Sequence, residues 1–400
     1  MVYVRHRLQH TFMPAEHLYI IGNGFDRYHG AKSSYWDFRG YLLRHDDWNA
    51  KFFELFFGPR SLINNFENPI DLELSLSFGK IIPYPRNTWA TTCLWCDFER
   101  YLSELDREKV LDFLDSRLPL IDQDNDNFSH ADYLAPINFI NDTVKECTFE
   151  MQYHFHRWVN TLQYRKGFKR DMIKFDPDAV FLNFNYTLFL EDHYRVPHEN
   201  ICYIHGDRRQ PFGSLVLGHR EIDADAAFDR WYHKHEKRKR YRQNLKDKKG
   251  KYFANDKLVY LAYFHNDKEQ GMGNYRLTTR YYAIEDAVSN TEEYFRHNIK
   301  QCDEIINQHQ QFFDSLKDVK LITILGHSLS DVDLPYFQEI VRHINHPENV
   351  QWQFTSHSDK DVTNMNRYCK ILNIPSENKA QPPYKISDFK TDWAGIHSHH

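Results

Sequence analysis

The chain has 400 residues, of which 41% are apolar and 16% aromatic, and a formal net charge of −5. This length exceeds what one hydrophobic core usually serves, so two or three structural units are expected, and the apolar content excludes a largely disordered chain. The charge is too small to indicate a nucleic-acid or membrane partner by itself. Six scattered cysteines fit a cytoplasmic protein with reduced thiols, and no segment is apolar enough to predict a signal peptide or a membrane span.

The first predicted strand, residues 18–21, runs directly into Gly22-Asn23-Gly24. A strand that ends in Gly-x-Gly before a helix is typical of a phosphate-binding turn, because backbone amides and the helix dipole favour an anion there. The third glycine of the G-x-G-x-x-G pattern is replaced by Arg27, so a plain strand–turn–helix is the alternative. Asp26 either caps the following helix or binds a ribose hydroxyl, and residues 33–35 (SSY) add polar groups near the turn.

Two long segments have helical periodicity. In residues 97–118, Phe98, Leu102 and Leu105 fall on one helical face. In residues 284–313, apolar side chains recur every three to seven positions, which predicts one helix of roughly eight turns.

Polar residues follow the next apolar runs. A predicted strand at 179–184 ends near Asn183 and Asn185, a second run ends at His205-Gly206, and a third ends at Gly218-His219. Ligands of open α/β sheets bind outside the carboxyl ends of the strands, so these residues are candidates for one crevice. Turn-forming asparagines and structural histidines are the alternative interpretation.

A further predicted strand, residues 321–325, leads into Gly326-His327-Ser328. A serine-hydrolase elbow needs G-x-S-x-G, and Ser330 occupies the last glycine position, which argues against that class of enzyme. We expect instead a loop whose Ser328, Asp331 and Asp333 meet sugar hydroxyls or cap the next helix.

Two features point to metal or nucleic-acid binding only weakly. Cys93 and Cys96 form a single C-x-x-C motif, whereas a structural zinc site normally needs a second pair, so we predict free thiols and no metal. The basic stretch 229–251 is either a solvated helix face and loop or a surface for a phosphate backbone.

Strands that alternate with helices predict an α/β fold with a parallel sheet and large helical insertions. We predict these parts: a discontinuous Rossmann-like nucleotide-binding domain of residues 14–60, 176–222 and 318–356, a helical insertion at 85–175, a basic and helical insertion at 223–317, and a polar C-terminal tail at 357–400.

Six motifs follow one another along the chain from residue 18: LYIIGNGFDRYHGAKSSYWDF, WCDFERYL, FLNFNYTLFLE, IHG, LVLGH and ILGHSLSDVD. In this order they resemble the AbiH family of bacterial abortive-infection proteins. That family is similar, more distantly, to the sirtuin-like NAD-binding fold. The resemblance implies a glycine-rich loop that cradles the pyrophosphate, an asparagine that holds the nicotinamide ribose, and a histidine that acts as general base.

Carried over to this chain, the resemblance implies that Asn185 and His205 are catalytic. It places the cofactor-binding residues at Gly22, Asn23, Gly24, Phe25, Asp26, Ser34, Tyr35, Gly206, Gly326, His327, Ser328 and Asp331. Gly326, Ser328 and Asp331 match the loop that receives the adenosine half.

The resemblance implies an anti-phage effector that hydrolyses NAD to nicotinamide and ADP-ribose. Sirtuin deacetylases carry a four-cysteine zinc module after the catalytic histidine, where this chain has only Cys302 and Cys369, which argues against deacetylation. The alternative is a nucleotide-binding sensor or a nucleic-acid-directed defence protein that does not hydrolyse NAD. We expect an NAD-like nucleotide as partner and no membrane; a phage-derived trigger, nucleic acid at 229–251 and a second copy of the chain are further partners to test.

Overall fold

The computed structural model describes residues 12, 14–46, 49–50, 53–54, 94–103, 138, 142, 150–165, 172–219, 298–380 and 383–389. The chain divides into two compact units. Unit 1 comprises residues 1–41, 152–217 and 300–400, and unit 2 comprises residues 42–151 and 218–299. Most of the two predicted insertions, including the basic stretch 229–251, Cys93 and the segment 104–118, lies outside the described residues.

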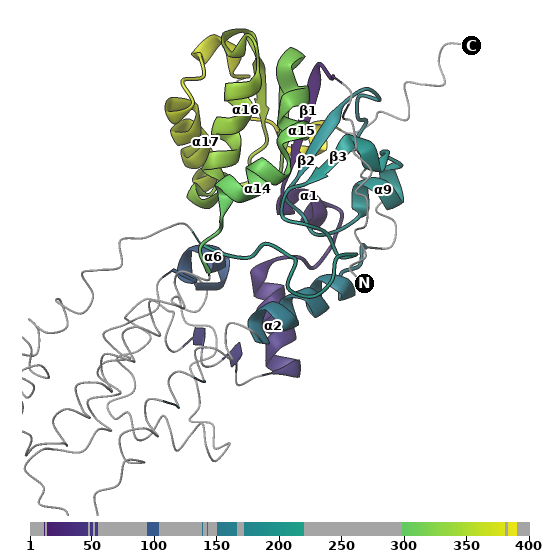
Figure 1. The fold of residues 1–400 in the computed structure, drawn as a ribbon, viewed down its shortest axis with the longest axis vertical. Helices are drawn as coiled ribbons and strands as arrows, with labels where there is room; N and C mark the ends of the chain where they lie inside the picture. The colour runs from purple at the N-terminus through teal and green to yellow at the C-terminus, as the bar shows by residue number, and fades with distance from the viewer. Residues whose placement is uncertain are drawn as a thin grey trace, which may run out of the picture. The chain divides into compact units, whose positions relative to one another are not determined.

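Unit 1 is built on a five-stranded sheet in which every pairing is parallel (Figure 1). The strand order is β3-β2-β1-β4-β5. The strands are β1 His17–Ile21, β2 Val180–Asn183, β3 Ile201–Tyr203, β4 Leu321–Leu325 and β5 Gln351–Phe354. The predicted α/β class with a parallel sheet is therefore confirmed, as are the strands expected near 18–21, 179–184 and 321–325.

Strands β1 to β4 are buried on both faces of the sheet, and their side chains alternate between the two faces. Leu18 and Ile20 of β1 point into one core, which contains apolar side chains of α14 Cys302–Gln308, α15 Gln310–Asp314, α16 Leu334–His343 and α17 Asp359–Ile371. Tyr19 and Ile21 point into a second core, which contains side chains of α1 Asn23–Tyr28 and α9 Phe189–Tyr194. Burial on both faces explains why the strands read as continuous apolar runs in the sequence.

The strand order places a topological switch point between β1 and β4. From β1 the chain builds outward through β2 to β3, and it then returns to the other side of β1 to form β4 and β5. The loops that leave β1 and β4 therefore start from adjacent strands at the carboxyl edge, which is where open α/β sheets place their ligands.

Three features differ from the sequence predictions or go beyond them. The single continuous helix expected across 284–313 is interrupted: Ile299 forms a bridge with His219, Lys300 and Gln301 are not helical, and the described helices there are α14 from Cys302 and α15 from Gln310. The run that ends at Gly218-His219 forms no regular strand. Residues after 357, expected to be a polar tail, begin with α17, whose Ser358 and Asp361 form a capping box.

The other described elements are short. They are α2 Tyr35–His45, α6 Phe98–Tyr101, an unlabelled helix at residues 150–161, and the 3₁₀ turns η3 His198–Asn200, η4 Ser315–Asp318, η5 Asp331–Asp333, η6 Pro347–Asn349, η7 Ser376–Asn378 and η8 Ile386–Phe389. In unit 2, the α6 ring of Phe98 stacks on Trp95, whose indole nitrogen donates to Glu54.

Candidate functional site

The Gly22-Asn23-Gly24 turn packs directly against the loop after β4. The amide of Gly22 donates to the carbonyl of Leu325 over 3.0 Å, and the amide of Gly24 donates to the carbonyl of Gly326 over 2.7 Å. A Cβ atom on Gly24 would lie 2.7 Å from the Cα atom of Gly326, and one on Gly326 would lie 2.3 Å from the nitrogen of Phe25. These glycines are required by the close approach of two backbone segments, and their amides are already hydrogen-bonded within the protein.

Asp26, in α1, is buried beneath this turn. Its two carboxylate oxygens accept hydrogen bonds from Asn185 Nδ2 over 2.9 Å and from Thr187 Oγ1 over 2.6 Å. Burial raises the pKa of Asp26 to about 6, and the hydrogen bonds from Thr187 and Asn185 and the charge of Arg208 partly offset that rise. Asp26 thus ties α1 to the segment that follows β2.

Asn185 is held from two sides. Besides Asp26, its Nδ2 atom contacts the carbonyl of Gly22 over 3.1 Å, and its backbone amide donates to Asn183 Oδ1 over 3.0 Å. The side-chain amide therefore has both of its donors directed into the protein, which fixes the orientation of the Oδ1 atom as well.

His205 follows β3 and lies against a buried acidic residue. Its Nε2 atom is 3.7 Å from Asp333 Oδ1 and makes no hydrogen bond. Lys300 Nζ lies 3.1 Å from the same Oδ1 atom, and His327 Nε2 lies 3.4 Å from Asp333 Oδ2. The ring of Phe184 packs against both histidines, with centroids 5.2 Å from His205 and 4.4 Å from His327.

The charges of this group decide the protonation states within it. Burial opposes ionisation of Asp333, but the Lys300 charge and the hydrogen bond from His327 outweigh it and hold the pKa of Asp333 far below its ordinary value. Burial lowers the pKa of His205 well below 6.5, and the charge of Lys300 lowers it further against the pull of Asp333. The group therefore contains an ionised carboxylate, a lysine counter-ion and a neutral His205.

Residues 18–356 match the family model described as bacteriophage abortive infection AbiH. The chain belongs to the AbiH family. No curated protein and no solved structure gives a significant match. The resemblance inferred from the six sequence motifs is thus confirmed, and the matched segment reaches past β5.

The structure gathers the predicted AbiH site residues into two networks. Gly22, Asp26 and Asn185 share the first, and His205 and His327 share the second, around Asp333. Both networks lie at the carboxyl ends of the strands.

Other predicted residues have contacts of their own. Ser34 and Asp37 cap α2, and Asn23 exchanges hydrogen bonds with Ser33. Tyr35 lies near the ring of Phe155, and Gly206 has a φ of 80°. Ser328 and Asp331 are both exposed. The Ser328 carbonyl accepts a hydrogen bond from Asn364, and Asp331 forms an ion pair with Arg367 over 2.7 Å.

Sequence reasoning missed two residues of this candidate site. Lys300 stands between an isolated bridge and α14, in no recognisable motif, and its pairing with Asp333 becomes visible only in three dimensions. Thr187 follows Asn185 at the spacing N-x-T. Both side chains donate to Asp26, and a search for partners of a buried acid could have found Thr187 through this shared acceptor.

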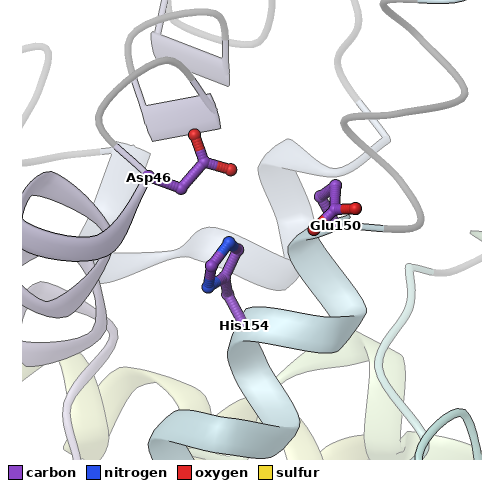
Figure 2. Close-up of side chains that lie close together, drawn as sticks. All are labelled: Asp46, Glu150 and His154. Atoms are coloured by element: carbon purple, nitrogen blue, oxygen red, sulfur yellow. The ribbon is translucent and has the colours of Figure 1, made fainter.

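Among the residues that the structure describes, one group of three potential metal ligands occurs: Asp46, Glu150 and His154 (Figure 2). The Asp46 carboxylate accepts hydrogen bonds from the backbone and side-chain nitrogens of Asn49. Glu150 and His154 stand one turn apart on the helix at 150–161. The three residues are divided between the two units, and we build no metal site on them. The described part of the chain also holds no helix long and apolar enough to cross a membrane.

Proposed function

We propose that this AbiH protein hydrolyses NAD at the carboxyl edge of its sheet and so depletes the cofactor in infected cells. The observation that carries the proposal is the placement of Asn185 and His205 after the adjacent strands β2 and β3, each supported by its own buried carboxylate. Membership of an abortive-infection family supports a reaction that stops the metabolism of the host cell.

The proposed fold assignment is a Rossmann-like, sirtuin-like domain. The parallel sheet and the switch point between β1 and β4 support it. The amides of the glycine turn donate to the carbonyls of Leu325 and Gly326, so this turn packs the β1 loop tightly against the β4 loop. We therefore assign the reacting end of NAD to Asn185 and His205 and leave the pyrophosphate contact of Asn23 and the adenosine contact of Ser328 as predictions.

The proposed reaction breaks the bond between the nicotinamide nitrogen and C1′ of the ribose. The bonding electron pair leaves with nicotinamide, which becomes neutral, and a water oxygen bonds to C1′. The transition state has oxocarbenium character, so ribose orientation by Asn185 and proton acceptance by His205 are the contributions that the protein can make. His205 takes one proton from the water and then releases it to solvent, so that NAD⁺ and water give nicotinamide, ADP-ribose and a proton.

The test compares the wild-type protein with His205→Gln and with His346→Gln, in which an exposed histidine is replaced. NAD and free nicotinamide are measured with purified protein, with and without a phage lysate, and in infected cells. We expect His205→Gln to reduce nicotinamide release by at least about 100-fold and His346→Gln to retain it. A folded His205→Gln protein with full activity, or a wild-type protein that never releases nicotinamide under any of these conditions, would refute the proposed reaction.

A further inference from the structure

Asp333 is surrounded by potential donors. Its Oδ1 atom accepts a hydrogen bond from Lys300 Nζ and faces His205 Nε2. Its Oδ2 atom faces His327 Nε2. The Lys300 and Asp333 side chains are 0% and 9% exposed, so water screens this charge pair little. A buried carboxylate of this kind orients the hydrogen-bond donors around it, because their protons are drawn toward its oxygens.

The protonation of His327 is fixed by the loop after β4. The backbone amide of Leu329 donates to His327 Nδ1 over 3.0 Å, so Nδ1 is an acceptor and the ring proton must be on Nε2, which faces Asp333. Leu329 reaches this position with a φ of 51°, which is uncommon for a residue with a branched side chain. The loop conformation thus sets the tautomer of His327.

His205, like His327, has its Nε2 atom facing a carboxylate oxygen of Asp333. The charged and titratable groups that act on it are Lys300, Asp333, His327 and His309. Within the described residues, Asp333 Oδ1 is the one carboxylate oxygen within ion-pair distance of its Nε2 atom. A neutral imidazole carries a single ring proton, and an anionic neighbour favours that proton on the nitrogen that faces it.

We propose that Asp333, anchored by Lys300 and His327, is a positioning residue that holds the His205 proton on Nε2 and so leaves Nδ1 as the atom that accepts a proton from the attacking water. The tautomer itself does not depend on the reaction, whereas its use in proton transfer rests on the proposed NAD hydrolysis. The other nitrogen assignment would place a lone pair of Nε2 against the carboxylate and leave Nδ1 unable to act as a base.

The first experiment determines the tautomer directly. In protein labelled with ¹⁵N-histidine, long-range ¹H–¹⁵N correlations distinguish protonated from unprotonated ring nitrogens, and His205→Gln assigns the signals. We expect His205 to be neutral with its proton on Nε2 from pH 6 to pH 8. A doubly protonated His205 at pH 7, or a proton on Nδ1, would overturn the inference. This measurement uses the wild-type protein, so it decides the question even if the Asp333 variants fold poorly.

The second experiment compares Asp333→Asn with Asp303→Asn, in which an exposed acid of α14 is replaced. An amide has one acceptor oxygen where a carboxylate has two, so Asn at 333 cannot accept from Lys300 and His327 and also face His205 in the same way. We expect mixed His205 tautomers, a kcat lowered by about 100-fold and an unchanged KM for Asp333→Asn, with wild-type values for Asp303→Asn.

The outcomes separate the two proposals. If the wild type hydrolyses NAD and folded Asp333→Asn keeps the wild-type kcat and tautomer, the role of Asp333 is refuted and the proposed function stands. If the wild type shows the Nε2 proton but never consumes NAD, the positioning of His205 stands and the proposed reaction is refuted.

Discussion

The side-chain amide of Asn185 donates to the carboxylate of Asp26 over 2.9 Å, which binds the residue after β2 to the helix after β1. The same amide contacts the carbonyl of Gly22, so one side chain joins both segments at the carboxyl edge of the sheet. The sequence predicted that Asp26 caps the following helix or binds a ribose hydroxyl. In the structure its side chain is buried, and its direct role is to hold Asn185 and Thr187.

Replacing Asp26 with Ala should therefore destabilise the protein. The change leaves Asn185 Nδ2 and Thr187 Oγ1 without their shared acceptor, and unsatisfied buried donors cost about 1–3 kcal/mol each. We expect a loss of about 3 kcal/mol in the free energy of unfolding, measured by urea denaturation. Asp178→Ala, at an exposed position, should change it by less than about 0.5 kcal/mol. Equal effects of the two variants would contradict this role.

The raised pKa of Asp26 predicts a specific pH dependence. The unfolded chain releases this proton near 3.8 and the folded protein near 6, so the folded state holds more protons between these values. Stability contributed by this group must then fall as the pH rises. Relative to Asp26→Asn, which cannot ionise, the wild type should lose about 2 kcal/mol between pH 4 and pH 7. Urea denaturation of both proteins at each pH measures the difference, and a constant difference would argue against a buried titrating Asp26.

Gly326→Ala should disrupt the contact between the β1 and β4 loops. Gly326 has a φ of 69°, and an added Cβ would lie 2.3 Å from the nitrogen of Phe25. Backbone strain and overpacking together should lower the free energy of unfolding by on the order of 3 kcal/mol. Gly213→Ala is the matched control, since Gly213 also has a positive φ, of 82°, but has nothing within 4 Å of the added atom. Gly213→Ala should lower the free energy of unfolding by about 1 kcal/mol, the cost of holding alanine at a positive φ. If the control is as damaging, close packing does not explain Gly326.

Lys300→Met should be among the most destabilising single changes. It removes the counter-ion that lies 3.1 Å from buried Asp333, and breaking one side of a buried ion pair costs about 3–5 kcal/mol. Thermal unfolding of this variant, compared with Lys317→Met at an exposed position, measures the effect. A melting temperature that equals that of the control would show that Asp333 does not depend on Lys300 for its charge.

The sequence was sufficient to predict the parallel sheet and the position of the candidate catalytic residues. Strands buried on both faces leave continuous apolar runs, and Asn185 and His205 stand directly after two of them. The long helix across 284–313 could not be excluded, because its interruption depends on the pairing of Ile299 with His219, a contact distant in the sequence.

The role of the glycine turn was also beyond the sequence. A glycine that admits a phosphate and a glycine that admits another backbone have the same pattern, and Gly326, the partner of Gly24, is far along the chain. Lys300 shows the same limit, because a buried counter-ion is defined by its partner in space and not by neighbouring residues.

The central strand β1 has a further consequence for how the protein is made. His17 pairs with Leu321, so β1 lacks one of its two neighbours until β4 has been translated. Three groups follow β4 in the chain: the Gly326 carbonyl that accepts from the Gly24 amide, the loop that orients His327, and Asp333. A nascent chain that has exposed His205 therefore still lacks the carboxylate beside it, whereas Gly22 and Asp26, which hold Asn185, are already present. Only the network around Asp333 must wait until β4 has been made, and premature termination before β4 would leave His205 without its supporting carboxylate.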